Sequence, residues 1–135
     1  MASVPLAPPE VEERLRAQFG DDVVSFADQA GHAAVGVSPG RYRDVVRFLR
    51  DDPAFACDLL DFVAGVDHAE EGLEVVTHLF STTLRHNVRV KVRLPKDEPV
   101  GPAIADIYAG AIWHERETME MFGIDFDGHP LPVKL

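Results

Sequence analysis

Cysteine is almost absent from this sequence: the 135 residues contain a single one, Cys57. One thiol cannot form a disulfide within the chain, and an iron–sulfur cluster usually takes four cysteine ligands. Phe55 and Ala56 precede Cys57, and no histidine or basic residue adjoins it to lower the pKa of its thiol. We therefore expect a buried and inert thiol in a chain that carries neither a disulfide nor a cluster.

Positive charge is also scarce, because 13 Lys and Arg residues face 23 Asp and Glu residues, for a net charge of -10. That balance argues against a nucleic-acid-binding protein, which needs a basic face to neutralise phosphates. No apolar run approaches the ~20 residues of a membrane span. The N-terminal residues lack the basic start and long apolar core of a signal peptide. We expect an intracellular, soluble chain.

The motifs of common active sites are missing too. Gly36 to Gly40 lacks the lysine of a phosphate-binding loop, and the chain contains no G-x-G-x-x-G. His114-Glu115-Arg116-Glu117 begins like the helix of a zinc peptidase, but the second histidine that this helix requires is replaced by Thr118. His114 and Glu117 are more simply a hydrogen-bonded or interfacial pair. By themselves, the residues indicate no self-contained catalytic, metal or cofactor site.

Two carboxylates acting as acid and base are a further possibility, since Glu115, Glu117 and Glu120 lie close together in the sequence. An exposed charged helix face is the simpler interpretation of these three residues. Basic residues alternate with apolar ones at 88–94, so that Arg89, Lys91 and Arg93 share one face of a strand. This basic face is either the solvent side of a sheet or, in so acidic a chain, a docking patch.

The length fits one domain, which we place at residues 9–135 after a flexible segment at 1–8. Apolar periodicity and turn residues predict helices at about 9–19, 39–51 and 109–121, and strands at 23–27, 32–37, 73–81 and 86–94. Residues 59–66 fit either a strand or a short helix followed by a strand, and 102–108 fit a short helix or an extended connection. The order α-β-β-α-β-β-β-α indicates a two-layer α+β domain, with helices on one face of a largely antiparallel or mixed sheet.

Particular side chains are expected in the core of that domain. In the first helix Val11, Leu15 and Phe19 recur every four residues, which predicts a buried stripe. Ser38 is placed to cap the second helix. The residues expected on the buried side of the second helix are Tyr42, Val45, Val46, Phe48 and Leu49.

The stretch from Trp113 to Pro130 carries more information than its periodicity. It contains E-R-E, two residues, an acidic residue, one residue, F-G-I and then G-H-P. This pattern resembles the signature of the C-subunit family of NADH-quinone oxidoreductase, the hydrophilic thirty-kilodalton subunit of respiratory complex I. The resemblance extends upstream, to residues 47–53, 65–67, 73–76 and 85–87.

The resemblance implies an α+β subunit of the peripheral arm that supports electron transfer from NADH to quinone without a catalytic site. It would bear no cofactor or metal, and its partners would be the iron–sulfur and quinone-site subunits, with flavin and clusters on other chains. Its place would be peripheral, on the cytoplasmic side of the cell membrane, with only indirect membrane contact. The residues expected to be structural or at interfaces with other subunits are His114, Glu115, Arg116, Glu117, Glu120, Phe122, Gly123, Gly128, His129 and Pro130.

Within that set, Phe122 would fill a core or an interface, and Gly123 would permit a left-handed exit from the helix. The sequence departs from the family pattern in two places. Glu120 stands where the family usually has Asp, and after G-H-P the usual D-L-R-R is replaced by residues 131–135, with Lys134 as their only basic group. Two alternatives therefore remain: the related small subunit of a membrane-bound nickel–iron hydrogenase, and a stand-alone adaptor.

Overall fold

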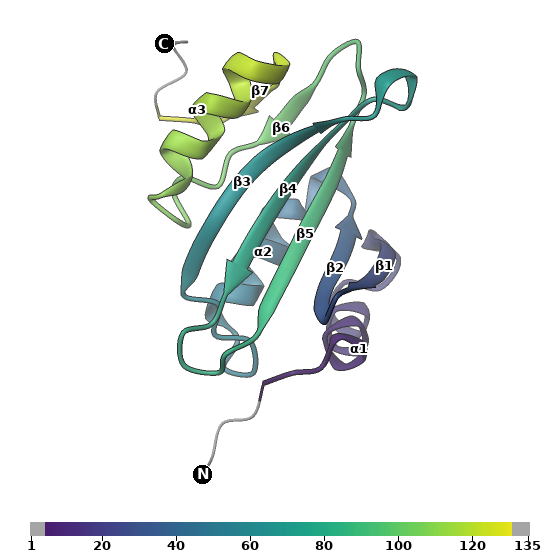
Figure 1. Cartoon of the computed structure of the whole chain (residues 1–135), viewed down its shortest axis with the longest axis vertical. Coiled ribbons are helices and arrows are strands. Elements are labelled where there is room, and N and C mark those ends of the chain that lie inside the picture. The colour runs from purple at the N-terminus through teal and green to yellow at the C-terminus, as the bar shows by residue number, and fades with distance from the viewer. Residues whose placement is uncertain (1–4, 131–135) are drawn as a thin grey trace.

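The computed structural model describes residues 5–130 (Figure 1), so the expectations for residues 1–4 and for 131–135, including Lys134, lie outside it. The first half of the fold holds two helices and a hairpin: α1 (Pro8–Phe19), β1 (Val23–Gln29), β2 (His32–Val37) and α2 (Tyr42–Asp51). The second half holds β3 (Leu59–Asp67), β4 (Leu73–Phe80), β5 (Asn87–Leu94), β6 (Val100–Pro102), α3 (Ala111–Phe122) and β7 (Asp125–Asp127).

Five of the strands form one sheet in the order β1-β2-β5-β4-β3. Neighbouring strands are antiparallel except for β2 and β5, which run parallel with Val35 opposite Val90. The chain makes this parallel pairing possible by crossing over through α2, β3 and β4 before it returns as β5. The expected α+β fold with a mixed sheet is confirmed.

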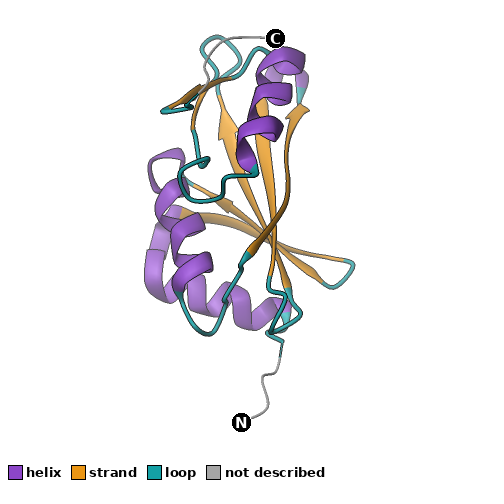
Figure 2. Ribbon diagram, turned by 90° about the vertical axis from the view of Figure 1, so that its left-hand side faces the viewer, coloured by secondary structure: helices purple, strands orange, loops and turns teal. Residues whose placement is uncertain are grey.

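The helices pack on one face of this sheet around a single hydrophobic core. Tyr42 of α2 reaches Thr77 of β4 in a buried hydrogen bond, and the Phe122 ring of α3 lies against Gly65 of β3. The strand register places positions 65 and 77 on the same face of the sheet as the buried valines of β5. Figure 2 shows the layer of α1 and α2 on one side of the sheet, and α3 lies beside β3 (Figure 1).

The core stripes predicted for the first two helices are confirmed. Val11, Leu15 and Phe19 of α1 are all buried, as are four of the five residues named for α2. The fifth, Phe48, is partly buried, and its ring meets that of Phe19 edge-on with the two centroids 5.5 Å apart. Cys57 is buried as expected, and burial raises the pKa of its thiol to about 12.

Some local expectations were wrong, and one open question is resolved. Residues 59–67 are a strand throughout, paired antiparallel with β4. Ser38 makes no side-chain capping hydrogen bond, since a short 3-10 turn at Pro39–Arg41 precedes α2. The sequence pattern also missed β6 and β7, which are three residues each and too short for periodicity to reveal. Within residues 5–130, none of the helices has the length and apolar character needed to cross a bilayer.

Candidate functional site

The helix α3 and the turn that follows it carry the ten motif residues. Gly123 adopts the left-handed conformation with φ 69°, and its N–H donates to the carbonyl of Met119 at 3.0 Å. The predicted left-handed exit is thus confirmed. It directs the chain into β7, which pairs parallel with β6 through Gly101 and Phe126 and so ties the end of the motif to the rest of the domain.

Glu115 lies on the inner side of α3 and is 0% exposed. Its Oε2 accepts a hydrogen bond from the backbone N–H of Ile104 at 2.9 Å, whereas its Oε1 has no hydrogen-bond partner. Burial raises the pKa of this carboxyl to about 7, because desolvation outweighs the bond from Ile104. Glu115 therefore holds the 103–107 connection against α3.

His129 closes the turn onto the same helix. Its Nε2–H donates to the carbonyl of Ile112 at 3.1 Å, and the same nitrogen lies 3.8 Å from Oε1 of Glu115. Gly128, with φ 85°, supplies the backbone conformation that brings the histidine back to α3. Glu115, Gly128 and His129 thus form an internal brace.

The outer side of α3 has a different character. The only tryptophan of the chain, Trp113, is 62% exposed, and Met121 is 75% exposed. Glu117 and Glu120 are exposed on the same helix, and the Arg116 guanidinium lies 5.5 Å from the centroid of the Trp113 ring. Large apolar side chains, carboxylates and a cation thus share this surface, which we call the outer face of α3: Trp113, Arg116, Glu117, Glu120 and Met121.

Phe122 joins the brace to the sheet. Its ring is partly buried in the core, and a Cβ added to Gly65 would stand 2.6 Å from the Cδ2 atom of the ring. Beside the ring is a shallow hollow of about 210 Å³, which is lined by residues of β3 and by Thr118 and Met121 of α3. The absence of a side chain at position 65 is what lets α3 approach β3 this closely.

The basic residues of β5 point away from the helices, onto the face of the sheet seen in Figure 1. Two of them already have partners within the chain. Arg93 donates to Glu74 at 3.0 Å, and Arg89 donates to Nδ1 of His78 at 3.2 Å. This face is therefore an ordered surface in which Arg89 and Arg93 are held in place by internal bonds.

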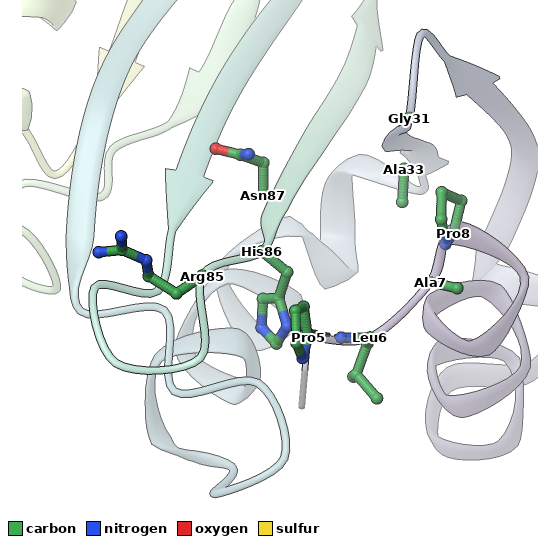
Figure 3. Close-up of a pocket in the computed structure, with 9 residues that line it drawn as sticks. All are labelled: Pro5, Leu6, Ala7, Pro8, Gly31, Ala33, Arg85, His86 and Asn87. Atoms are coloured by element: carbon green, nitrogen blue, oxygen red, sulfur yellow. Dashed lines mark hydrogen bonds between the residues drawn. The ribbon is translucent and has the colours of Figure 1, made fainter. Parts of the chain in front are cut away.

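A separate hollow lies where the residues before α1 pass the start of β5, around His86 (Figure 3). The two ring nitrogens of His86 are both used there: Nδ1 accepts from the backbone N–H of Leu6 at 3.0 Å, and Nε2–H donates to the carbonyl of Phe55 at 2.7 Å. The ring anchors the segment that enters α1. Its lone pair and its proton are thereby occupied by contacts within the chain.

The structure separates the predicted site residues into a buried group and an exposed group, and their interface role stays a prediction. Thr118 and Met119 are buried beside Glu115, while Pro130 and Glu117 are exposed. Among residues 5–130, no three His, Cys, Asp or Glu side chains are grouped to hold a metal ion. Trp113 and Met121 were not predicted as surface residues, although their spacing places them on the helix face of the exposed glutamates. Trp113 lies four residues before Glu117 and seven before Glu120, and Met121 lies four residues after Glu117.

Comparison with known proteins identifies relatives of the whole domain. A family model described as the 30 Kd subunit of the respiratory-chain NADH dehydrogenase matches residues 35–135. The C subunit of NADH-quinone oxidoreductase from Roseiflexus sp. (strain RS-1) is 44% identical over 122 residues, which cover 89% of this chain and 70% of that protein. The C 2 subunit of the same enzyme from Rhizobium etli (strain CIAT 652) is 39% identical over 115 residues, or 84% of this chain and 61% of that protein.

Two solved structures share the fold. The trypsin-resistant fragment (1-134) of Nqo5 superposes with a TM-score of 0.77 at 25% identity and covers 90% of this chain and 96% of the fragment. A chain of the membrane-bound sulfane sulfur reductase, an archaeal respiratory membrane complex, superposes with a TM-score of 0.75 at 25% identity. The match covers 91% of this chain and 72% of that chain. The chain belongs to the family of the 30 Kd subunit of the respiratory-chain NADH dehydrogenase.

Proposed function

We propose that this chain is a docking subunit of a multisubunit NADH-quinone oxidoreductase, complex I, and that it bears no cofactor of its own. Other subunits of the complex are then its partners, as the names of its relatives suggest. Within this complex, we assign the chain to the peripheral arm, on the cytoplasmic side of the cell membrane, beside iron–sulfur and quinone-site subunits. There the chain supports electron transfer from NADH to quinone by holding its neighbours in position.

One observation carries this proposal: a tryptophan and a methionine are exposed together with carboxylates on a helix that is rigidly held from behind. Trp113 is 62% and Met121 75% exposed, and burial of side chains of this size is a main source of affinity at protein interfaces. Tryptophan and methionine are enriched at such interfaces relative to the rest of a protein surface. The outer face of α3 is thus the best candidate for contact with a neighbouring subunit.

The inner side of α3 explains why the motif also contains residues that face no solvent. Glu115 and His129 are 0% exposed at their side chains, and each bonds a backbone group of the domain itself. Because they fix the helix against the 103–107 connection and the final turn, the outer face is presented in one orientation. A preorganised surface loses less entropy on docking than a mobile one.

A second candidate is the equivalent small subunit of a membrane-bound nickel–iron hydrogenase or a related respiratory complex. The structural likeness to a chain of the sulfane sulfur reductase complex favours it, since the TM-score of 0.75 nearly equals the 0.77 for Nqo5. Both candidates use the chain as a docking subunit, and they differ in the large subunits with which it assembles.

Affinity purification of the tagged full chain from native membranes, followed by identification of the proteins that co-elute, tests the proposal. Recovery of a NADH-binding flavoprotein with iron–sulfur subunits is the expected result. A nickel-ligating large subunit with paired C-x-x-C motifs would replace complex I by the hydrogenase candidate. Elution of the chain by itself at monomer size would contradict both and favour a stand-alone adaptor.

A further inference from the structure

The face of the main sheet that the helices leave uncovered carries half-buried charges rather than a uniformly solvated surface. No described helix lies over it, and Figure 1 looks onto it, with α2 behind β4 and β5. In the strand register, Lys91 stands on this face between Val76 of β4 and Gly36 of β2. Whether this face needs a partner depends on whether its charges satisfy each other.

Near His78, the charged side chain of Arg89 is paired within the chain. Arg89 donates to Nδ1 of His78 and to Oε1 of Gln29, each at 3.2 Å, and Nε2 of His78 lies 3.0 Å from Oδ1 of Asn87. The Phe62 ring stacks on His78 with 4° between the planes. At this end of the open face, the Arg89 guanidinium and the His78 ring are therefore already engaged within the chain.

Further along β5 the surface sinks into a hollow of about 400 Å³. Gly36, the neighbour of Lys91 on β2, is one of the residues that line it, and the Ser25 side chain fills the space beside Gly36. The walls carry one carboxylate, Glu74, which is already engaged by Arg93 at 3.0 Å and by Nε2 of His68 at 3.2 Å. Both carboxylate oxygens of Glu74 thus already have a partner within the chain. Within residues 5–130, by contrast, no hydrogen bond or ion pair engages the ammonium group of Lys91.

We propose that this hollow docks an acidic side chain of a neighbouring subunit, with Lys91 as the cation that meets the aspartate or glutamate carboxylate. The inference rests on the proposed function. Two cations and one carboxylate line the hollow, so it has one positive charge in excess, whereas the whole chain has a net charge of -10. An acidic segment is repelled by most of this protein and attracted here, which gives the docking its specificity. Val24, 63% exposed at the rim, offers an apolar contact to the same segment.

Amine labelling of the native complex tests this contact without any substitution. The purified complex and the isolated chain are treated with an acetylating reagent, and the labelled lysines are quantified by mass spectrometry. Lys91 is expected to be acetylated at least about tenfold less in the complex than in the isolated chain, while Lys96, exposed after β5, serves as the matched control and reacts equally in both. Equal labelling of Lys91 in both samples, or an amine already unreactive in the isolated chain, overturns the inference.

Zero-length carbodiimide coupling then identifies the occupant, because it joins an amine directly to a contacting carboxylate. We expect a cross-linked peptide pair that joins Lys91 to an aspartate or glutamate of another subunit. Protection of Lys91 without such a pair overturns the assignment of an acidic side chain. Lys91→Glu should lower the yield of co-purified subunits by about tenfold at moderate ionic strength, and Lys96→Glu should leave it unchanged.

The two proposals fail in different ways. If the complex co-purifies with the chain but Lys91 stays reactive in it, docking at the hollow is wrong and the assignment to the complex stands. If no other protein of the complex co-purifies, the proposed function is wrong. Docking at the hollow is then wrong as well, because there is no neighbouring subunit to bind.

Discussion

The Nε2 atom of His129 lies 3.8 Å from the Oε1 atom of Glu115, and both side chains are fully buried. The two residues are separated by the last two turns of α3, the left-handed exit at Gly123 and the short strand β7. This contact brings the end of the motif back onto α3. The buried polar groups lie on the inner side of the helix, and the outer face of α3 is left available for contact.

Replacement of Glu115 tests the buried carboxyl, because the effect of the replacement on the free energy of unfolding should depend on pH. Burial raises the pKa of Glu115 to about 7 in the folded chain, above its ordinary 4.5. The folded state therefore holds this proton more tightly, and the stability that it contributes is fully present below about pH 4.5 and is lost as the pH rises through 7. Glu115→Gln, which cannot ionise, should gain about 2–3 kcal/mol in free energy of unfolding relative to the parent between pH 5 and pH 8.

Urea unfolding at the two pH values measures this difference, with Glu117→Gln as the control because Glu117 is exposed on the same helix. The control should show the same stability relative to the parent at both pH values. If Glu115→Gln instead loses more stability at pH 8 than at pH 5, the folded state favours the ionised carboxylate, and the predicted direction is wrong.

The contact between Gly65 and Phe122 predicts a steric coupling. A Cβ at position 65 would stand 2.6 Å from the ring, so Gly65→Ala should cost about 1–3 kcal/mol of stability through overpacking. Phe122→Ala should cost about 2 kcal/mol, less than a fully buried phenylalanine, because its ring is only partly buried. The double variant should cost less than the sum of the two, as measured by denaturant unfolding of all four proteins; strict additivity would mean that the ring and position 65 do not touch.

Gly123 should be sensitive for a reason that involves no clash. Its φ is 69° and no atom stands within 4 Å of a Cβ placed there, so Gly123→Ala should cost about 1–2 kcal/mol through the left-handed backbone alone. Gly123→Asn should cost less, since asparagine tolerates this conformation better. Gly40→Ala is the matched control, with equally open space and no positive φ, and should change the free energy of unfolding by less than about 0.5 kcal/mol. Equal losses at positions 40 and 123 would refute the backbone explanation.

The exposed tryptophan tests the proposed docking face. Trp113→Ala should change the stability of the isolated chain by less than about 0.5 kcal/mol, because the side chain is 62% exposed, yet should reduce co-purification of the other subunits about tenfold or more. Leu59→Ala, at an exposed apolar position of β3, is the control and should assemble normally. Arg116→Ala should likewise impair assembly more than isolated stability. A Trp113→Ala chain that assembles like its parent would remove the outer face of α3 from the interface.

Several features of this protein followed from the sequence by itself. The buried stripe of α1, the buried side of α2 and the alternation of β5 were predicted from spacing, because the period of apolar residues reports which side of an element faces the core. The family resemblance of residues 113–130 was likewise carried by residue order. The left-handed Gly123 followed from the same motif, since glycine is the residue that tolerates this conformation without strain.

Only the tertiary structure decided which elements meet. The parallel pairing of β2 with β5 joins segments more than 50 residues apart, and three-residue strands such as β6 and β7 are too short to carry a period. The three glutamates of the motif look alike in sequence, but Glu115 faces Ile104 across the helix boundary and is buried, whereas Glu117 and Glu120 are exposed. Burial and charge partnership depend on what lies opposite a side chain, and that is set by packing between elements rather than by spacing within one.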